Sequence, residues 1–285
     1  MKLRILLALI LSASFTFAAE KPLKLLLIAG GCCHDYAAQK DILKAGIEAR
    51  ANATVDIIFT TDYEIGAKGT PDATRPKFPI YGNPDYAKGY DLVIHDECAA
   101  SISVPGVIEG VLAPHRAGLP GVNLHCAMHS YRVGGASDPI TDPADPHAFW
   151  FQYLGIQSSR HGPQEPIVIA YTDTAHAITT GLAGWTTIKE ELYNNVAVLT
   201  AHALAKGTQT VKKKDGTSED VESVVVWTNE YGPKKARVFS TTIGHNNDTV
   251  ADARYLDLVT RGVLWACDKL DASGKAKAGY GPGGK

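Results

Sequence analysis

The chain has 285 residues and a formal net charge of −2, and charged residues make up 20% of its composition. This balance provides no strongly basic surface, so nucleic acid and membrane-surface partners are not expected. Five cysteines are too few for a small disulfide-stapled fold, and their odd number leaves at least one without an intramolecular partner. The length suits one large domain.

The first 19 residues have the pattern of a secretory signal peptide. Lys2 and Arg4 precede an apolar run over residues 5–17, and the small residues Ala18 and Ala19 mark the expected cleavage site. The run is too short for a stable membrane span. We therefore expect residues 1–19 to direct export, and the mature protein to be periplasmic or secreted with no membrane association.

Apolar runs and helical spacing alternate through the first half of the chain. Runs that predict strands lie at residues 23–29, 55–59, 91–95 and 122–124. A helix capped by Asp35 and a second helix over residues 104–117 separate them, as in right-handed βαβ units. The Pro-rich residues 61–89 predict a long surface loop near the site.

The second half predicts a different kind of sheet. A short amphipathic helix over residues 147–154 comes first, and a helix ending near Cys267 comes last. The strands expected between them have no long helices to connect them, so they should be mixed or antiparallel; they cover residues 167–170, 187–193, 197–200, 221–228 and 237–243. Lys212–Lys214 before Asp215-Gly216 predicts a solvated hairpin turn. The main domain is expected over residues 22–269, and the Gly- and Lys-rich residues 270–285 are expected to be disordered.

Histidines follow three of the predicted strands. His34 comes after the first strand, His125 after the fourth and His245 after the last. Parallel strands end at one edge of a sheet, so we expect these imidazoles to share a cleft. With a carboxylate they could bind a divalent metal ion such as zinc, or act as general acid and base without one. The candidate carboxylates are Glu190, Glu191 and Asp35.

The stretch from residue 119 to residue 132 concentrates reactive side chains. His125 and Cys126 end its strand, and His129 and Arg132 follow. Such residues build sites in open α/β sheets, whereas a lone buried His or Cys is more often structural. Cys126 paired with His245 would suit a hydrolase.

The remaining histidines and cysteines allow fewer conclusions. His161, His176 and His202 are expected to be loop histidines outside the site. A disulfide between Cys98 and either Cys32 or Cys33 stays open. The glycine-rich nucleotide-binding motifs and G-x-S-x-G do not occur in the sequence, so we expect neither a nucleotide cofactor nor serine-hydrolase chemistry.

An ordered series of short motifs resembles the ThuA-like, or trehalose-utilisation, family. The series runs from about residue 25 to residue 266 and includes Leu27–Gly31 with His34-Asp35, Gly121–His125, Asp173–Leu182, Glu190–Tyr193 and Thr242–His245. Ala177 and Glu190 stand where the family usually has Pro and Asp. The resemblance implies a flavodoxin-like, class I glutamine amidotransferase-like fold: three α/β/α layers around a mostly parallel sheet with antiparallel additions.

The resemblance also implies a role in sugar breakdown, on a disaccharide or a keto-sugar. The family aligns His125 at the turn where amidotransferase-like relatives carry a nucleophilic Cys, which weakens the Cys126–His245 hydrolase. We therefore expect catalytic or metal-binding roles for His34, His125 and His245, with Glu191 to orient or bind. Residues expected to contact the carbohydrate are Asp35, His129, Arg132, Trp150, Tyr193 and Trp227, with core packing as the alternative for the two tryptophans. A non-catalytic sugar-binding module is a further alternative, and a homo-oligomer is compatible with the sequence.

Overall fold

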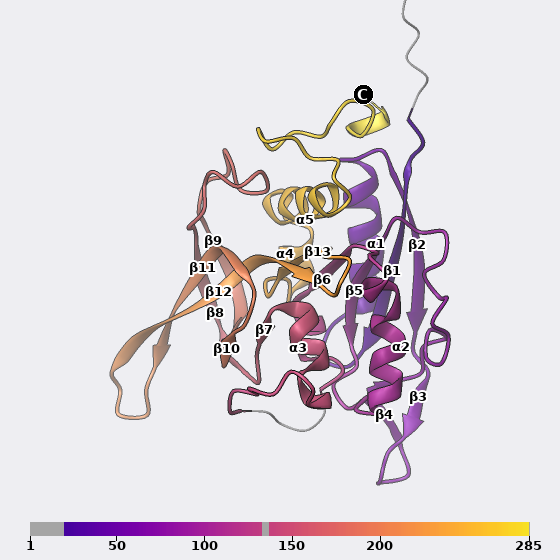
Figure 1. Ribbon diagram of the computed structural model, residues 1–285. Helices are drawn as coiled ribbons and strands as arrows, with labels where there is room; N and C mark the ends of the chain where they lie inside the picture. Colours follow the sequence, from indigo (N-terminus) through magenta and orange to yellow (C-terminus); the bar gives the residue numbers. More distant parts are fainter. Residues whose placement is uncertain (1–19, 133–136, 285) are drawn as a thin grey trace, which may run out of the picture.

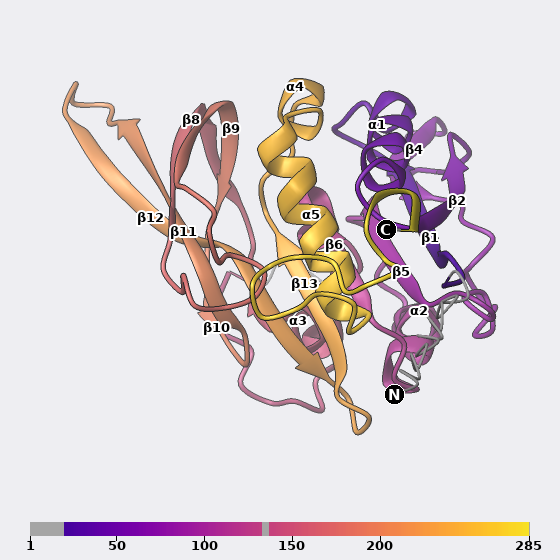
Figure 2. The same cartoon turned by 90° about the horizontal axis from the view of Figure 1, so that it is seen from above.

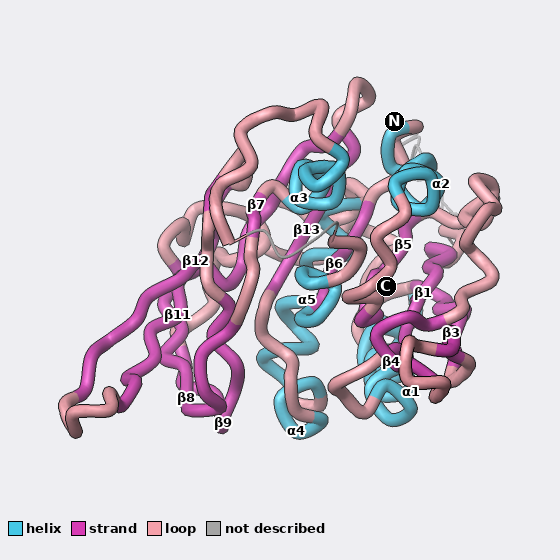
Figure 3. Tube along the Cα trace, turned by 90° about the horizontal axis from the view of Figure 1, so that it is seen from below, coloured by secondary structure: helices cyan, strands magenta, loops and turns pink. Residues whose placement is uncertain are grey.

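The computed structural model describes residues 20–132 and 137–284, so the predicted signal peptide lies outside the described residues. Its centre is a nine-stranded sheet with the strand order β2-β1-β5-β6-β13-β12-β11-β8-β9 (Figure 1). Helices cover both faces of this sheet, which gives three layers (Figure 3). The predicted α/β/α fold class is therefore confirmed.

One half of the sheet is parallel. β1 (Leu23–Gly31) pairs with β2 (Ala53–Thr60) and with β5 (Leu92–Cys98). β6 (Gly121–Leu124) lies between β5 and β13 (Ala236–Thr241). The carboxyl ends of these strands meet at one edge, as a parallel arrangement requires.

The apolar run of β1 is explained by its burial on both faces. Leu25 and Leu27 belong to one hydrophobic core, whereas Leu26 and Ile28 belong to the other. A strand covered on both sides needs apolar residues at successive positions rather than alternate ones. The helices that contribute to the first core are α1 (Tyr36–Glu48) and α5 (Ala253–Ala266), and those in the second are α2 (Pro105–Arg116) and α3 (Phe149–Leu154).

Beyond β13 every pairing of the sheet is antiparallel, as the short spacing between strands predicted. The strands are β12 (Ser218–Tyr231), β11 (His202–Lys212), β8 (His161–Tyr171) and β9 (Trp185–Tyr193). They lie on the opposite side of α5 from β1 and β2 (Figure 2). The predicted turn is present, because the Lys213 amide donates to the Thr217 carbonyl at 2.7 Å.

Shorter elements complete the described chain. They are β3 (Tyr63–Ile65), β4 (Pro71–Pro76), β7 (Ile156–Gln157), β10 (Ala197–Val198), α4 (Asn247–Val250) and the 3₁₀ helices His125–His129, Pro146–Ala148 and Pro282–Gly284. No helix in residues 20–132 or 137–284 is long and apolar enough to cross a membrane.

Two segments differ from the sequence-based expectation. Residues 61–89 are more than a surface loop, because they form β3 and β4 and place Phe78 and Ile80 in the core. Residues 270–284 are ordered rather than disordered. Leu270 is buried and bridges Ala276, and the Tyr280 carbonyl accepts a hydrogen bond from the Asn52 amide at 3.0 Å. A few apolar anchors thus outweigh the polar composition of this segment.

Candidate functional site

The carboxyl edge of the parallel strands brings the three predicted histidines together. His34 follows β1, His125 opens the 3₁₀ helix after β6, and His245 lies between β13 and α4. The centroid of the His34 ring lies 4.6 Å from that of His125 and 4.7 Å from that of His245. These distances therefore agree with the convergence that the strand topology predicted.

Glu191 of β9 completes the cluster from the antiparallel half of the sheet. Its Oε2 atom lies 3.3 Å from His245 Nδ1 and 3.6 Å from His125 Nε2. Ligand atoms from His34, His125, His245 and Glu191 all lie within 4.8 Å of one another. Three imidazoles and one carboxylate at this spacing form a donor set that a divalent metal ion can use.

A backbone contact sets the tautomer of His125. Its Nδ1 atom lies 2.6 Å from the Thr242 carbonyl oxygen, so Nδ1 carries the proton and Nε2 is left as an acceptor. Nε2 faces the Tyr193 hydroxyl at 3.4 Å. His125 has a φ of 40°, in the left-handed region that few residues other than glycine adopt. A strained residue at a strand-to-helix turn is a candidate for function.

The loop that carries His245 is held by two polar side chains. Gln39 of α1 donates to the carbonyls of Gly244 and His245 at 3.3 Å and 3.1 Å. Glu190 accepts from the backbone amides of His245 and Asn246 at 2.9 Å and 3.2 Å. Of the two predicted glutamates, Glu190 thus fixes the loop and Glu191 faces the imidazoles.

Burial and neighbouring charges shift the pKa values of the imidazoles in opposite directions. Burial, together with nearby His125 and His245, lowers the pKa of His34 to about 3. The Glu191 carboxylate, 3.3 Å from Nδ1, instead raises the pKa of His245. Burial opposes ionisation of Glu191, but its contacts with the His125 and His245 imidazoles outweigh this and lower its pKa. At neutral pH, a neutral His34 therefore lies beside an ionised carboxylate.

Two nitrogen atoms of the cluster are buried without a hydrogen bond. They are His34 Nδ1 and His245 Nδ1, and the 3.3 Å contact of the latter with Glu191 lacks hydrogen-bond geometry. Buried polar atoms in native proteins nearly always have partners. A bound metal ion would provide such a partner, so the residues fit a metal centre.

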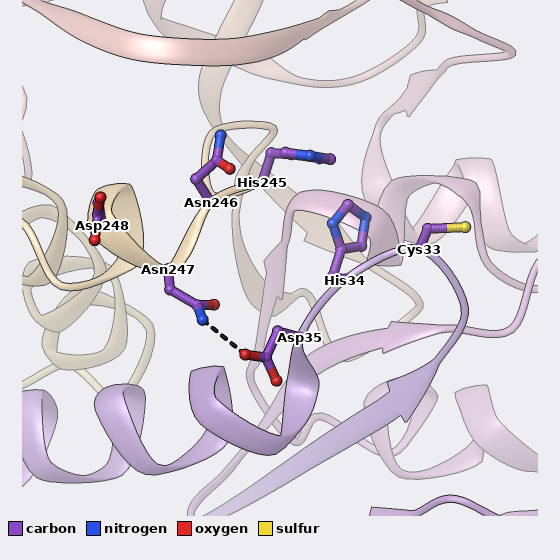
Figure 4. A pocket seen from close by; sticks show the side chains of 7 residues that line it. All are labelled: Cys33, His34, Asp35, His245, Asn246, Asn247 and Asp248. Carbon is purple, nitrogen blue, oxygen red and sulfur yellow. Dashed lines mark hydrogen bonds between the residues drawn. The ribbon is translucent and has the colours of Figure 1, made fainter.

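The cluster adjoins an open cavity of about 580 Å³ (Figure 4). Asp35, which caps α1, accepts a hydrogen bond from Asn247 at 2.8 Å across this cavity. Cavities of about 300–1,000 Å³ are typical of small-molecule sites. Carboxylates and amides suit a ligand rich in hydroxyl groups. The lining residues are Cys33, His34, Asp35, His245, Asn246, Asn247 and Asp248.

The aromatic residues predicted to face a carbohydrate do not do so. Trp150 and Trp227 are each 1% exposed, and their indole N–H groups donate to the carbonyls of Ala127 and Leu154. Both pack in the core between the sheet and α3, so the core-packing alternative is correct for them. Tyr193 is also buried. Its ring packs against the rings of His125 and His161, with centroids 4.8 Å and 5.5 Å away, and its hydroxyl faces His125 Nε2.

His129 and Arg132 lie behind the site. The His129 ring stacks on Tyr193 with centroids 4.1 Å apart, and its Nε2 atom lies 2.9 Å from Ser158 Oγ. Arg132 donates to the Ser159 carbonyl at 3.1 Å. Neither residue lines the cavity, so both support the position of Tyr193 and its neighbours.

Two residues of β8 join the site although the sequence pattern did not indicate them. His161 Nε2 lies 3.6 Å from Glu191 Oε2, so its expected place outside the site is wrong. Gln164 Nε2 lies 2.9 Å from His245 Nε2. The β8–β9 ladder sets His161 opposite Tyr193 and Gln164 opposite Glu191. Only the register of this antiparallel pair could have identified them.

His176 and His202 form a separate pair elsewhere. His202 Nε2 lies 2.8 Å from Asp173 Oδ2, and the His176 ring packs against Trp265. Both residues lie outside the cluster, as the sequence analysis expected.

Cys126 belongs to a group of thiols rather than to the imidazole cluster. Its Sγ atom lies 2.6 Å from Cys98 Sγ, while His245 contacts Gln164 and Glu191. Within the described ranges no hydrogen bond joins Cys126 to His245, so the hydrolase alternative lacks its geometry. All five cysteines are free, so the bridge from Cys98 to Cys32 or Cys33, which the sequence left open, is not formed.

The molecule is thus a three-layer α/β protein with a histidine–glutamate cluster at the carboxyl edge of its parallel strands. Residues 116–266 match the ThuA family, which is described as trehalose utilisation. The match covers more than half of the sequence, and the chain belongs to this family. It includes His125, Glu191 and His245, whereas His34 precedes it.

Two solved structures of ThuA-like proteins share this fold. A ThuA-like protein from Parabacteroides merdae has a TM-score of 0.59 and 20% identity, covering 90% of this chain and 92% of its own. A ThuA-like protein from Bacteroides uniformis has a TM-score of 0.55 and 16% identity, covering 92% and 98%. A glutamine amidotransferase from Thermotoga maritima has a TM-score of 0.43 and 8% identity, covering 87% and 100%. A comparison with curated proteins finds no match.

Proposed function

We propose that this ThuA-family protein acts on a carbohydrate at His34, His125, His245 and Glu191, by metal-assisted chemistry or by acid–base chemistry without a metal. The observation that carries the proposal is the convergence of their ligand atoms within 4.8 Å beside a polar cavity. The family description, trehalose utilisation, supports a sugar as the substrate. A disaccharide or a keto-sugar is the class that we favour.

The donor set supports a borderline divalent ion such as Zn²⁺. His125 offers Nε2, because its Nδ1 proton is engaged by the Thr242 carbonyl, and Glu191 offers an ionised carboxylate. Such an ion, when bound, polarises a carbonyl or hydroxyl oxygen of its substrate. Asp35 and Asn247 would hold sugar hydroxyl groups at the cavity wall.

Without a bound ion, the same residues would provide an acid and a base. His34 has a lowered pKa and is a neutral proton acceptor at pH 7, whereas His245 has a raised pKa and holds a proton more readily. Titratable groups whose environments push their pKa values apart are suited to opposite roles in proton transfer. Gln164 and Glu191 orient His245 for this role.

Metal analysis tests the first part of the proposal. We expect the purified wild-type protein to hold about one divalent ion per chain and His125→Ala to hold little. His202→Ala is the matched control, because His202 is exposed and contacts Asp173 away from the cluster. Equally low metal content in all three proteins would overturn the metal centre.

Turnover tests the second part. The wild-type protein and His125→Ala would be assayed against disaccharides and their 3-keto forms, with the variant expected to lose activity. Saturable sugar binding that survives His125→Ala, with no turnover in either protein, would identify a non-catalytic sugar-binding module. Activity lost on thiol alkylation and in Cys126→Ser, but kept in His34→Ala, would favour the Cys126 hydrolase instead.

Export is a separate part of the proposal. The basic residues and apolar run within residues 1–19 support cleavage near Ala18 or Ala19 and a periplasmic or secreted location. Cell fractionation followed by N-terminal sequencing tests it. An intact Met1 on protein that stays in the cytoplasm would overturn it.

A further inference from the structure

A group of sulfur atoms lies directly behind the imidazole cluster. The Sγ atoms of Cys32, Cys33 and Cys98 lie within 4.8 Å of one another, and Cys32 Sγ is 3.4 Å from Cys98 Sγ. Two sulfur atoms bound to one zinc ion, at about 2.3 Å each, lie no more than about 4.6 Å apart. The three thiols are therefore close to the spacing that a single ion would impose.

We propose that Cys32, Cys33 and Cys98 form a second metal site, which binds a thiophilic ion such as Zn²⁺ or Cd²⁺. Three thiolates select soft and borderline cations over Mg²⁺ and Ca²⁺, which prefer oxygen ligands. The site differs in chemistry from the histidine–glutamate cluster, so this inference goes beyond the proposed function and does not depend on it.

Two dipeptides divide the ligands between the two sites. Cys33-His34 and His125-Cys126 each place an imidazole in the cluster of histidines and a sulfur in or beside the group of thiols. Neighbouring residues point in different directions at these turns, partly because Cys33 and His125 have φ values of 84° and 40°. The same two turns therefore build both sites.

Gly31 allows the first of these turns to approach β5. It has a φ of 107°, and a Cβ atom at this position would lie 2.1 Å from the Cys98 carbonyl oxygen. Without a side chain at position 31, the backbone next to Cys32 packs against the end of the strand that carries Cys98. This contact brings sulfur atoms from distant parts of the chain together.

The surroundings of the thiols combine access with an apolar wall. Cys33 is exposed and lines the cavity, so an ion can enter from solvent. Cys98 is buried among Ala29, Tyr36 and Phe59. An apolar shell strengthens the interaction between a cation and its thiolates, because it excludes water.

Titration of the full chain with Cd²⁺ alone tests the site. A cadmium–thiolate bond gives ultraviolet charge-transfer absorption that imidazole and carboxylate ligands do not give. We expect this absorption to saturate at about one ion per chain. Cys32→Ser and Cys33→Ser should each weaken the apparent affinity beyond the about 10–100-fold cost of losing an outer-shell partner.

Two further variants separate the sites. Cys267→Ser is the matched control, because Cys267 contacts the Asp91 carbonyl at the opposite end of β5 and should leave the titration unchanged. His245→Ala should keep the thiolate absorption while it removes metal from the histidine cluster. Failure of the proposed metal centre and failure of the thiol site would therefore give different results.

Three outcomes would overturn the thiol site. The first is no thiolate absorption in the wild-type protein, and the second is absorption that persists unchanged in both Cys32→Ser and Cys33→Ser. The third is a disulfide between Cys98 and Cys126 in the purified chain, whose Sγ atoms lie 2.6 Å apart. Intact mass and peptide mapping after alkylation would detect it.

Discussion

Two histidine–glutamate clusters lie within residues 20–132 and 137–284, and the one that contains His34 and His245 lines the cavity described above. In the core, His95 Nδ1 lies 2.8 Å from Glu97 Oε1, and His95 Nε2 lies 3.1 Å from His115 Nε2. His115 Nδ1 meets the Leu119 carbonyl, and Tyr131 donates to the same Glu97 oxygen. Every imidazole nitrogen of this core network has a partner, and the three groups are fully buried.

The comparison shows which feature distinguishes a binding site from a structural network. Burial lowers the pKa of both His34 and His115 to about 3, so a perturbed pKa does not separate them. The two clusters differ in the hydrogen bonding of their imidazole nitrogens and in their access to solvent. His34 Nδ1 and His245 Nδ1 have no hydrogen bond, and both residues line a cavity. Imidazole nitrogens left open beside solvent call for a ligand, whereas imidazoles whose nitrogens are all paired support the fold. The unpaired atom of the core network is a carboxylate oxygen, Glu97 Oε2, in a fully buried residue.

The strongest way to test this contrast is His34→Ala. Loss of a direct ligand should weaken metal binding by more than about 100-fold, the upper cost of losing an outer-shell partner. The free energy of unfolding should change by less than about 1 kcal/mol without metal, because the substitution also removes an unsatisfied buried nitrogen. Isothermal titration with Zn²⁺ and guanidinium unfolding measure the two quantities. Unchanged Zn²⁺ affinity would place the ion elsewhere.

Glu97→Ala should show the reverse behaviour. It leaves His95 Nδ1 and the Tyr131 hydroxyl without a partner in the core, at about 1–3 kcal/mol for each buried group. We expect the free energy of unfolding to fall by about 3 kcal/mol or more, with metal affinity of the folded protein unchanged. Urea unfolding checks the first quantity. A loss below about 1 kcal/mol would show that this network contributes little to stability.

Glu190→Gln should have a smaller effect on the open cluster. The Glu190 carboxylate accepts hydrogen bonds from the backbone N–H groups of His245 and Asn246. A glutamine side chain accepts less strongly than a carboxylate, so the loop that carries His245 should loosen. We expect metal affinity to fall about tenfold. Glu222→Gln is the control, because Glu222 is exposed and pairs with Lys206 away from the cluster. Equal affinity of both variants and wild type would exclude a positioning role for Glu190.

The smallest expected effect is a pH dependence from His245. Its pKa is raised in the folded state by the neighbouring Glu191 carboxylate, so its stabilisation is present below the unfolded pKa of about 6.5. The stabilisation should disappear as the pH rises through the folded pKa. Thermal unfolding of metal-free wild type and His245→Gln, at pH 6 and pH 9, measures it. A wild-type advantage that is larger at pH 9 would contradict the assigned sign.

The sequence predicted the parallel half of the molecule well for a physical reason. Buried parallel strands are continuous apolar runs, and a histidine after such a run must lie at the carboxyl edge. His34, His125 and His245 could therefore be placed without coordinates. Glu191 could be chosen only as one of several carboxylates, because its strand comes from the antiparallel half.

The antiparallel half and the tryptophans were harder to predict. β11 has a weak strand pattern because Gly207 interrupts it, although a Cβ atom there would lie 2.7 Å from Ile167 and 2.8 Å from Val225. The place of His161 depends on the register of β8 against β9, which the residues of either strand alone do not specify. Trp150 and Trp227 carry one polar atom each, and their backbone partners in the core could not be identified from residue type.

The absence of a side chain at Gly31 affects both the histidine–glutamate cluster and the group of thiols. Gly31→Ala would force the loop after β1 away from the Cys98 carbonyl, and both Cys33 and His34 would move with it. A single carbon atom would thus disturb a nitrogen-rich and a sulfur-rich environment at once. Natural variation at this position should therefore be narrower than at any residue whose own side chain takes part in binding.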